Sequence, residues 1–243
     1  MSLFKHIIYT FTVICLCSCA ADMYSDYDSI YDSNVTMGNI VEGKFISDQG
    51  LSYNIIDQTC EDKLDGIKRA MISCDIINKI DEKNYDIILN DVEEIFTKSP
   101  IDSTAVTNED NLIENPINIG EVWYSGGYLN MLISFPVKKD SSQAHLINLV
   151  RNDEKSSTGN HEFTFRHNAF GEIITTEDID FVLAGRYVSF PLTHFFKQDE
   201  TNIQIILNWT SNTTEDGVWS AATKKNKICI PVSRTGYEHK HWE

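Results

Sequence analysis

Short runs of alternating apolar and polar residues, separated by turn-forming residues, constrain the fold of this chain more than any other feature. Val, Ile, Phe and Tyr recur at alternate positions, and clusters of Gly, Asn, Asp and Ser divide the runs. Such a pattern is typical of β-strands that bury one face. No stretch sustains a long 3.6-residue apolar period with caps at both ends. The sequence therefore predicts an all-β protein.

Residues 38–97 predict a small closed barrel. Asp48-Gln49-Gly50 is a plausible hairpin turn between two strands, and "DEKN" at residues 81–84 separates a second pair. About four or five short strands of this kind suit a small barrel. We expect Cys60 and Cys74 to be two buried thiols rather than a disulfide, because a hairpin near residue 64 would place Cys60 opposite a residue near Arg69 and not opposite Cys74.

Residues 116–235 predict an antiparallel β-sandwich of about seven strands, which begins with a hairpin around "SGG" at residues 125–127. The segment between the two modules, residues 98–115, is rich in Ser, Asp and Asn. It lacks strand periodicity, so we predict an exposed linker that proteases can cut. Residues 236–243 are predicted to be a solvated tail.

The first 18 residues have the proportions of a signal peptide. Lys5 and His6 precede an apolar run, Ile7–Leu16, that is shorter than the roughly 20 residues of a membrane-spanning helix. Leu16-Cys17-Ser18-Cys19 then resembles the lipobox of bacterial lipoproteins, which predicts lipidation of Cys19. The alternative is an ordinary secretory signal without a lipid, although the A-x-A cleavage pattern is absent before Cys19.

Residues 19–37 are predicted to form a disordered acidic tether that carries Asp22, Asp26, Asp28 and Asp32. Acidic residues soon after a lipidated cysteine resemble the surface-export signal of Bacteroidota lipoproteins. We therefore expect a protein that is lipid-anchored in the cell envelope, at the outer membrane, with periplasmic and surface-facing orientations both open. The net charge of -16 argues against nucleic acid and against anionic lipid headgroups as partners.

The histidines are candidates for a catalytic or metal site. His145, His161, His167 and His194 come from segments without metal-ligand spacing, and His167 alternates with two phenylalanines on one strand. Zinc binding, or a nucleophilic Cys229 paired with a histidine, is the alternative. We predict structural histidines, no catalytic residues, no metal and no cofactor.

The other polar and aromatic candidates have simpler interpretations. Arg151 and Arg166 are expected to stack and pair locally rather than capture an anion. Trp123, Tyr124 and Tyr128 around the "SGG" turn are a weaker candidate for an aromatic platform that binds sugar.

Two short triplets match the acceptor pattern of Bacteroidota O-glycosylation, which is an Asp, a Ser or Thr, and a residue with a methyl group. They are "DSI" at residues 28–30, in the tether, and "DST" at residues 102–104, in the linker. Exposed backbone accommodates a bulky glycan without loss of packing, so glycans are predicted on Ser29 and Ser103. Ordinary polar linker sequence is the alternative.

Three blocks of the second module resemble a known family. "IGEVWYSGGYLNMLISF", "HLINLVRN" and "EFTFRHNAF" are similar, in the same order and spacing, to blocks of the NigD-like lipoproteins of Bacteroidota. The resemblance implies an OB-like N-terminal barrel, a C-terminal β-sandwich and a lipoprotein signal. The polar segment "FGEIITTEDIDFVLAGR" and the C-terminal extension depart from the family pattern. No established activity comes with the resemblance.

The expected function is that of a non-enzymatic lipoprotein, attached to the membrane through Cys19, that acts as a binding, accessory or bacteriocin-immunity-like protein. Its partner is expected to be a protein or a glycan. A structural or adhesin-like surface subunit is the alternative, and a metal-dependent hydrolase is the third class.

Overall fold

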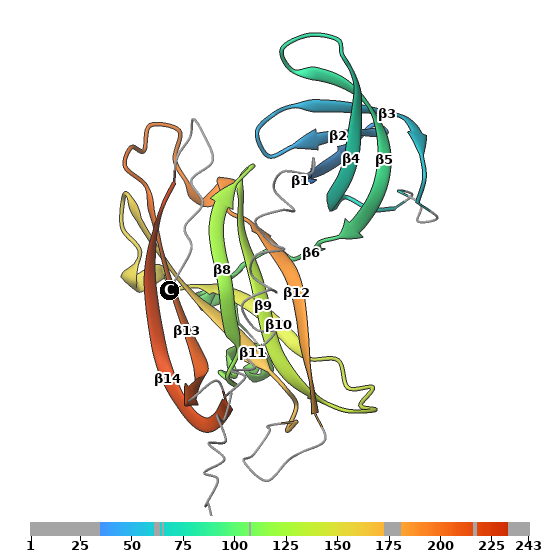
Figure 1. Ribbon diagram of the computed structural model, residues 1–243. Coiled ribbons are helices and arrows are strands. Elements are labelled where there is room, and N and C mark those ends of the chain that lie inside the picture. Colours follow the sequence, from blue (N-terminus) through green and yellow to red (C-terminus); the bar gives the residue numbers. More distant parts are fainter. Residues whose placement is uncertain are drawn as a thin grey trace, which may run out of the picture.

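The computed structural model describes residues 35–232, apart from 61–63, 65, 107, 173–180 and 216–217. In this part of the chain a barrel precedes a β-sandwich, so the predicted all-β class is confirmed (Figure 1). Its helices are single 3-10 turns. None of the helices in these residues has the length and apolar character needed to cross a membrane.

The N-terminal barrel closes in the order β1-β2-β3-β5-β4, which is a five-stranded Greek-key barrel of the OB type. Its strands are β1 (Val35–Val41), β2 (Lys44–Ser47), β3 (Ser52–Gln58), β4 (Arg69–Lys79) and β5 (Asn84–Glu94). Alternate side chains, including Phe45, Ile72, Ile87 and Leu89, fill its core. Strand β1 begins at Val35, so the first strand starts three residues before the predicted barrel boundary.

Both predicted barrel turns are confirmed. Asp48-Gln49-Gly50 joins β2 to β3, with Gly50 at a φ of 79° that glycine adopts without strain. Residues 81–84 join β4 to β5, and the Asp81 carboxylate accepts hydrogen bonds from the backbone N–H groups of Lys83 and Asn84. Because these bonds favour the charged carboxylate, they lower its pKa.

The predicted hairpin between β3 and β4 is wrong. Strand β3 pairs in parallel with β5, while β4 pairs with β5 and β1. Cys60 therefore does not face Arg69 across a ladder. Cys74 is buried, as predicted, whereas Cys60 is only half-buried. Burial raises the pKa of the Cys74 thiol to about 11, which makes it unreactive.

Two sheets form the sandwich. The five-stranded sheet has the order β14-β13-β11-β10-β7, and the four-stranded sheet has the order β6-β12-β9-β8. The strands of the first are β7 (Ile101–Asp102), β10 (Leu146–Arg151), β11 (Asn160–Asn168), β13 (Gln204–Glu215) and β14 (Val218–Pro231). The strands of the second are β6 (Phe96–Thr97), β8 (Asn118–Ser125), β9 (Tyr128–Lys138) and β12 (Phe181–Pro191).

The sandwich core lies between the inner faces of these sheets. Strand β11 shows the alternation that the sequence predicted, because Phe163, Phe165 and His167 are all buried on its inner face. Facing them across the core are Leu129, Met131 and Ile133 of β9 together with Val188 and Phe190 of β12. The antiparallel hairpins are present, but the pairs β10–β7, β11–β13 and β12–β6 are parallel. Strand β12 comes between β11 and β13 in the sequence but lies in the other sheet. The chain therefore crosses over and back, and β13 pairs with β11 in parallel.

The segment predicted to be a linker is built into the sandwich. Residues 101–102 form β7, which pairs with β10, and the 3-10 turns η1 (Ser103–Ala105) and η2 (Glu109–Leu112) follow. The side chain of Asn111 accepts a hydrogen bond from Asn148 at 2.9 Å, and the backbone N–H of Asn115 donates to the His167 carbonyl. The polar residues that indicated a linker therefore bind the outer face of the five-stranded sheet.

Candidate functional site

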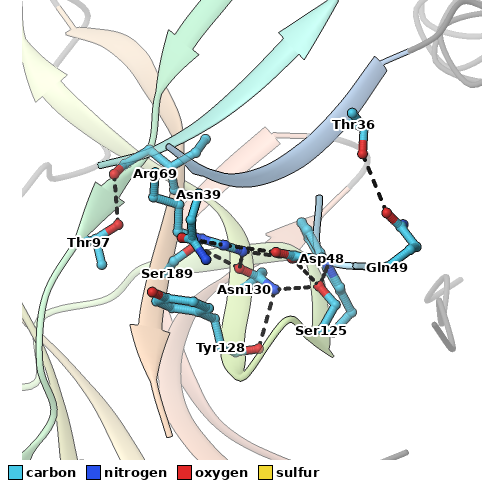
Figure 2. Close-up of polar contacts among 12 residues, drawn as sticks. Thr36, Asn39, Asp48, Gln49, Arg69, Thr97, Ser125, Tyr128, Asn130 and Ser189 are labelled. Atoms are coloured by element: carbon cyan, nitrogen blue, oxygen red, sulfur yellow. Dashed lines mark hydrogen bonds and ion pairs between the residues drawn. The ribbon is translucent and has the colours of Figure 1, made fainter. Parts of the chain in front are cut away.

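A buried arginine lies where the barrel meets the sandwich. Arg69 is the first residue of β4, and only 2% of its surface is exposed. Its Nη1 and Nη2 donate to Asp48 Oδ1 and Oδ2 at 2.9 and 2.8 Å, which is a bidentate ion pair within the barrel. Its Nε donates to Ser189 Oγ at 2.9 Å, and Nη2 also donates to Asn130 Oδ1 at 2.8 Å (Figure 2). Asn39 accepts the remaining bond, so the guanidinium donors are all used.

The sandwich also donates a hydrogen bond to the barrel in this network. Ser125 Oγ donates to Asp48 Oδ2 at 2.6 Å and accepts a hydrogen bond from Asn130 Nδ2 at 3.0 Å. Ser189 Oγ donates to Asn130 Oδ1 at 2.7 Å. We call these five residues, Arg69, Asp48, Ser125, Asn130 and Ser189, the junction node. Its hydrogen-bonding groups are mutually satisfied, which is the condition under which buried charge is tolerated.

Two residues of the "SGG" hairpin allow this close approach. A Cβ on Gly126 would lie 2.3 Å from Asp48 Oδ1, so a larger residue there would push the domains apart. Gly126 also has a φ of 58°, in the left-handed region. Tyr128 lies beneath the Arg69 guanidinium, with Cζ 3.9 Å from the ring centroid.

The three aromatic residues of the candidate sugar platform all have partners within the protein. Tyr128 is covered by Arg69, and Trp123 is buried, with Nε1 donating to Ser125 Oγ at 3.1 Å. Tyr124 packs edge-on against Phe196. These aromatic residues pack at the domain junction and against the core.

An open groove of about 590 Å³ lies beside the junction. We call it the inter-sheet groove, since its apolar lining comes from both sheets. That lining consists of Phe96, Phe135, Val137, Ile147 and Ala184. The barrel contributes Glu93 and Glu94, and β12 contributes Arg186, so one end of the groove is charged. Its volume falls in the range of roughly 300–1,000 Å³ typical of ligand sites.

The charged end of the groove is partly shielded from water. Burial raises the pKa of the Glu93 carboxyl, while the positive charge of Arg186 acts in the opposite direction and Asp91 adds to the rise. Lys98 donates from Nζ to the Ile147 carbonyl at 3.2 Å, and burial lowers its pKa. A positively charged ligand group would therefore be attracted to Glu93 more strongly here than in bulk water.

Two histidines meet next to this groove. His145 Nδ1 lies 3.0 Å from His167 Nε2, and His167 Nδ1 lies 2.9 Å from the Pro116 carbonyl. Since a carbonyl only accepts, His167 carries its proton on Nδ1 and accepts the His145 proton on Nε2. Burial lowers the pKa of His167 to about 4, so it is neutral at physiological pH. The pair joins β11 to the loop before β10 and is a hydrogen-bonded part of the core.

The remaining histidines do not join this pair. His161 lies 3.2 Å from Glu200 Oε1 and packs against Phe196, and His194 stacks on Phe195. Cys229 is exposed on β14, with β13 between it and β11. Over the residues that the structure describes, no three or more His, Cys, Asp or Glu side chains converge as a metal site would require.

Both arginines pair locally, as predicted, and Arg151 also shows the predicted stacking on an aromatic ring. Arg151 pairs with Asp153 at 2.8 Å and lies over the ring of Phe195. Arg166 pairs with Glu114 and donates to the Leu112 carbonyl at 3.1 Å. Both guanidinium groups therefore hold local loops against the five-stranded sheet.

The predicted modification sites can be located only in part. Cys19 and Ser29 lie outside the described residues. Ser103 is exposed at the start of η1, directly after β7. The lipid and both glycans stay predictions.

The fold and the junction node define a class of all-β protein in which an OB-type barrel is joined to a β-sandwich through a buried polar contact. The NigD-like C-terminal β-sandwich domain matches residues 99–221, which is half of the chain. The chain belongs to the NigD-like family. The matched range begins inside the predicted linker, in agreement with the packing of that segment against the sandwich.

Solved structures share this fold at low sequence identity. A NigD-like immunity protein from Bacteroides caccae is 17% identical with a TM-score of 0.55, and the match covers 78% of this chain and 88% of that protein. A candidate lipoprotein from Bacteroides fragilis is 12% identical with a TM-score of 0.58, covering 81% and 96%. A candidate toxin-related protein from Parabacteroides distasonis is 20% identical with a TM-score of 0.57, covering 80% and 91%. No curated protein matches the chain significantly.

Sequence reasoning missed the junction node. Asp48 was interpreted only as a turn residue, and Arg69 was used only as a position opposite Cys60. An available signal was the Arg at the start of an apolar strand, since a buried Arg requires a paired carboxylate.

Proposed function

We propose that this chain is a non-enzymatic binding protein of the cell envelope, anchored by a lipid on Cys19. The observation that carries the proposal is the junction node. It links the barrel to the four-stranded sheet through satisfied, buried polar bonds, so Glu93 and Glu94 of the barrel keep a fixed position beside the strands β9 and β12 that line the groove. A preformed site of this kind loses little free energy to ordering when it binds.

The proposed anchor is the acylated Cys19, followed by residues 20–34 as a spacer before β1. Several acyl chains bind a bilayer firmly, since each buried methylene contributes about 0.8 kcal/mol. The likeness of the fold to a candidate lipoprotein supports this proposal. Placement at the outer membrane is part of it and rests on the acidic residues that follow Cys19.

The anchor is tested with a Cys19→Ala variant in the native host. We expect labelled fatty acid to be absent from the variant and the protein to be recovered in a soluble fraction with its fold intact. A neighbouring variant, Ser18→Ala, keeps the cysteine and is the matched control. Label retained in Cys19→Ala would contradict the proposal.

The proposed role of binding is protection of the producing cell against a protein toxin. It is supported by the likeness to an immunity protein and to a toxin-related protein, and by a groove with apolar and charged ends. Deletion of the gene should lower survival when cells meet growth-inhibiting supernatants of related strains. The wild-type gene should restore survival, and the Cys19→Ala gene should not. Equal survival with and without the gene would refute the protective role.

The two predicted glycans belong to the same proposal. Ser103 is exposed beside the five-stranded sheet, where a glycan would displace no packed side chain. We expect the mass of protein purified from the native host to exceed that of the lipidated polypeptide, and the excess to fall in Ser29→Ala and Ser103→Ala variants. A mass equal to the lipidated polypeptide would contradict glycosylation.

A further inference from the structure

One half of β12 has an open edge. The strand pairs with β9 along its whole length, but on its other side β6 covers only Val188 and Ser189. From Phe181 to Arg186 no strand of the described residues pairs with this side. Val182 and Leu183 on this segment are 49% and 54% exposed, so the strand presents apolar surface beside its open edge. Unpaired strand edges bind other strands unless they are protected.

The edge of the other sheet is protected in the usual way. Strand β14 ends the five-stranded sheet and carries Lys224, Lys225 and Lys227. Lysines at an edge oppose pairing with another chain. The open part of β12 has no lysine, and its one charged residue, Arg186, lies over the Phe96 ring, with Cζ 5.1 Å from the ring centroid. The two edges therefore differ in their readiness to accept a strand.

The inter-sheet groove lies against this open edge. Ala184 packs against the core, and it lines the groove together with Gly185 and Arg186. Phe135, which pairs with Ala184 in the ladder between β9 and β12, lines the groove from the same sheet, and Ile147 of β10 lines it from the other sheet. A strand that paired with β12 would point alternate side chains into this apolar groove, as in strand-addition complexes. The partner must have an extended backbone, because only a strand can pair with the edge of β12 and at the same time place side chains in the groove.

The charged end of the groove favours a strand that carries a basic residue. Glu93 and Glu94 line it, Asp91 acts electrostatically on Glu93, and Arg186 is the cation among the lining residues. The three carboxylates exceed the two cations, Arg186 and the nearby Lys98, and the whole chain has a net charge of -16. A Lys or Arg near the end of the strand that faces the barrel would complement this excess.

We propose that the edge of β12 from Phe181 to Arg186 binds an extended segment of a partner protein by strand addition. The segment has apolar residues at alternate positions, which occupy the inter-sheet groove, and a Lys or Arg that reaches Glu93 and Glu94. This site deepens the proposed binding function, on which it rests, because it names the surface and the kind of partner.

The probe is a library of random dodecapeptides displayed on phage and selected on the mature chain with Cys19→Ala. We expect enrichment of peptides with alternating apolar residues and a basic residue at one end. Ala184→Lys, which places a charge in the groove, should weaken the best peptide about tenfold or more. Leu183→Lys is the matched control, since it adds the same charge to the adjacent residue on the opposite face. It should change affinity less than about twofold.

Equal losses in the two variants, or no enriched peptides, would overturn the proposal. Amide hydrogen exchange with the peptide bound should show new protection at residues 181–186, and protection only elsewhere would also overturn it. Self-association that Ala184→Lys abolishes would assign the edge to a second copy of the chain instead.

The survival assay separates this proposal from the proposed function. Protection that persists in an Ala184→Lys strain would refute strand addition as the mode and leave the protective role intact. Peptide binding by a protein whose deletion does not alter survival would refute the protective role and leave the site intact.

Discussion

The two halves of β12 have opposite surroundings. Residues Val188–Phe190 are fully buried. Val188 and Ser189 pair with β6, and Ser189 belongs to the junction node. Residues 181–186 are part of the same strand and the same ladder to β9, yet no described strand pairs with their other edge, and Val182 and Leu183 are exposed. Sequence composition changes little along the strand, so the difference comes from what covers the edge.

The comparison distinguishes structural polar groups from accessible ones. In the junction half, donors and acceptors are satisfied within the protein, which leaves nothing for a partner to contact. In the open half, backbone groups and apolar surface face the inter-sheet groove. A buried, satisfied network specifies the geometry of a protein, whereas an unprotected edge is a surface for binding.

The largest effect is expected from Arg69→Met. The change leaves the Asp48 carboxylate buried and unpaired, which costs about 3–5 kcal/mol of unfolding free energy. Urea denaturation measures it. Arg186→Met, at the open half of β12, is the control, and we expect a loss of less than about 1 kcal/mol for this exposed side chain. Similar losses would contradict the distinction between the two halves.

A pH effect of similar size is expected at the histidine pair beside the groove. The pKa of His167 is about 4 in the folded protein, below the ordinary 6.5, so the unfolded chain binds more protons between these values. The contribution of the neutral His167 to the unfolding free energy is therefore complete above pH 6.5. It is lost as the pH falls toward 4, by about 3 kcal/mol in unfolding free energy.

This pH dependence is measured as the difference between the wild type and His167→Gln. The carboxylates with lowered pKa values, Asp81, Glu172 and Glu200, are present in both proteins, so the difference reports on His167 and its partner His145, which also contacts Glu172. We expect the variant to lose less stability than the wild type between pH 7 and 5. Parallel losses would show that His167 is not the group responsible.

A smaller effect is expected from Gly126→Ala. The new Cβ would meet Asp48 Oδ1, and the positive φ adds strain, so we expect a loss of about 1–3 kcal/mol. Gly50→Ala is the control, because Gly50 also has a positive φ, but a Cβ added there would meet no atom within 4 Å. The excess loss at Gly126 measures the close contact between the domains, and equal losses would mean that the contact is loose.

The smallest effect concerns proteolysis between the domains. The Lys98 backbone N–H donates to the Ser189 carbonyl, and residues 101–102 pair with β10. We therefore expect trypsin to cut after Lys98 no faster than the protein unfolds globally. Arg69→Met should accelerate the cleavage. Rapid cutting of the wild-type protein at Lys98 would restore the interpretation of residues 98–115 as a linker.

The sequence predicted the barrel, the sandwich and several turns, because alternating residues and turn residues act locally. It did not predict the parallel β3–β5 pair or the attachment of residues 101–115, which depend on contacts between distant segments. The pairing of His145 with His167 was one of several open possibilities. The junction node was missed because Arg69, Asp48 and Asn130 are far apart in the sequence, and each has an ordinary local role.

Amide hydrogen exchange on the intact mature protein tests the comparison most directly. The amides of Ile95 and Leu192, which bond to Arg69 and Gly127 at the junction, should exchange only through global unfolding. Open-edge amides in residues 181–186 should exchange much faster and become protected when a selected peptide binds. Junction amides that exchange as fast as those of the open edge would contradict the account, because the two domains would then move independently.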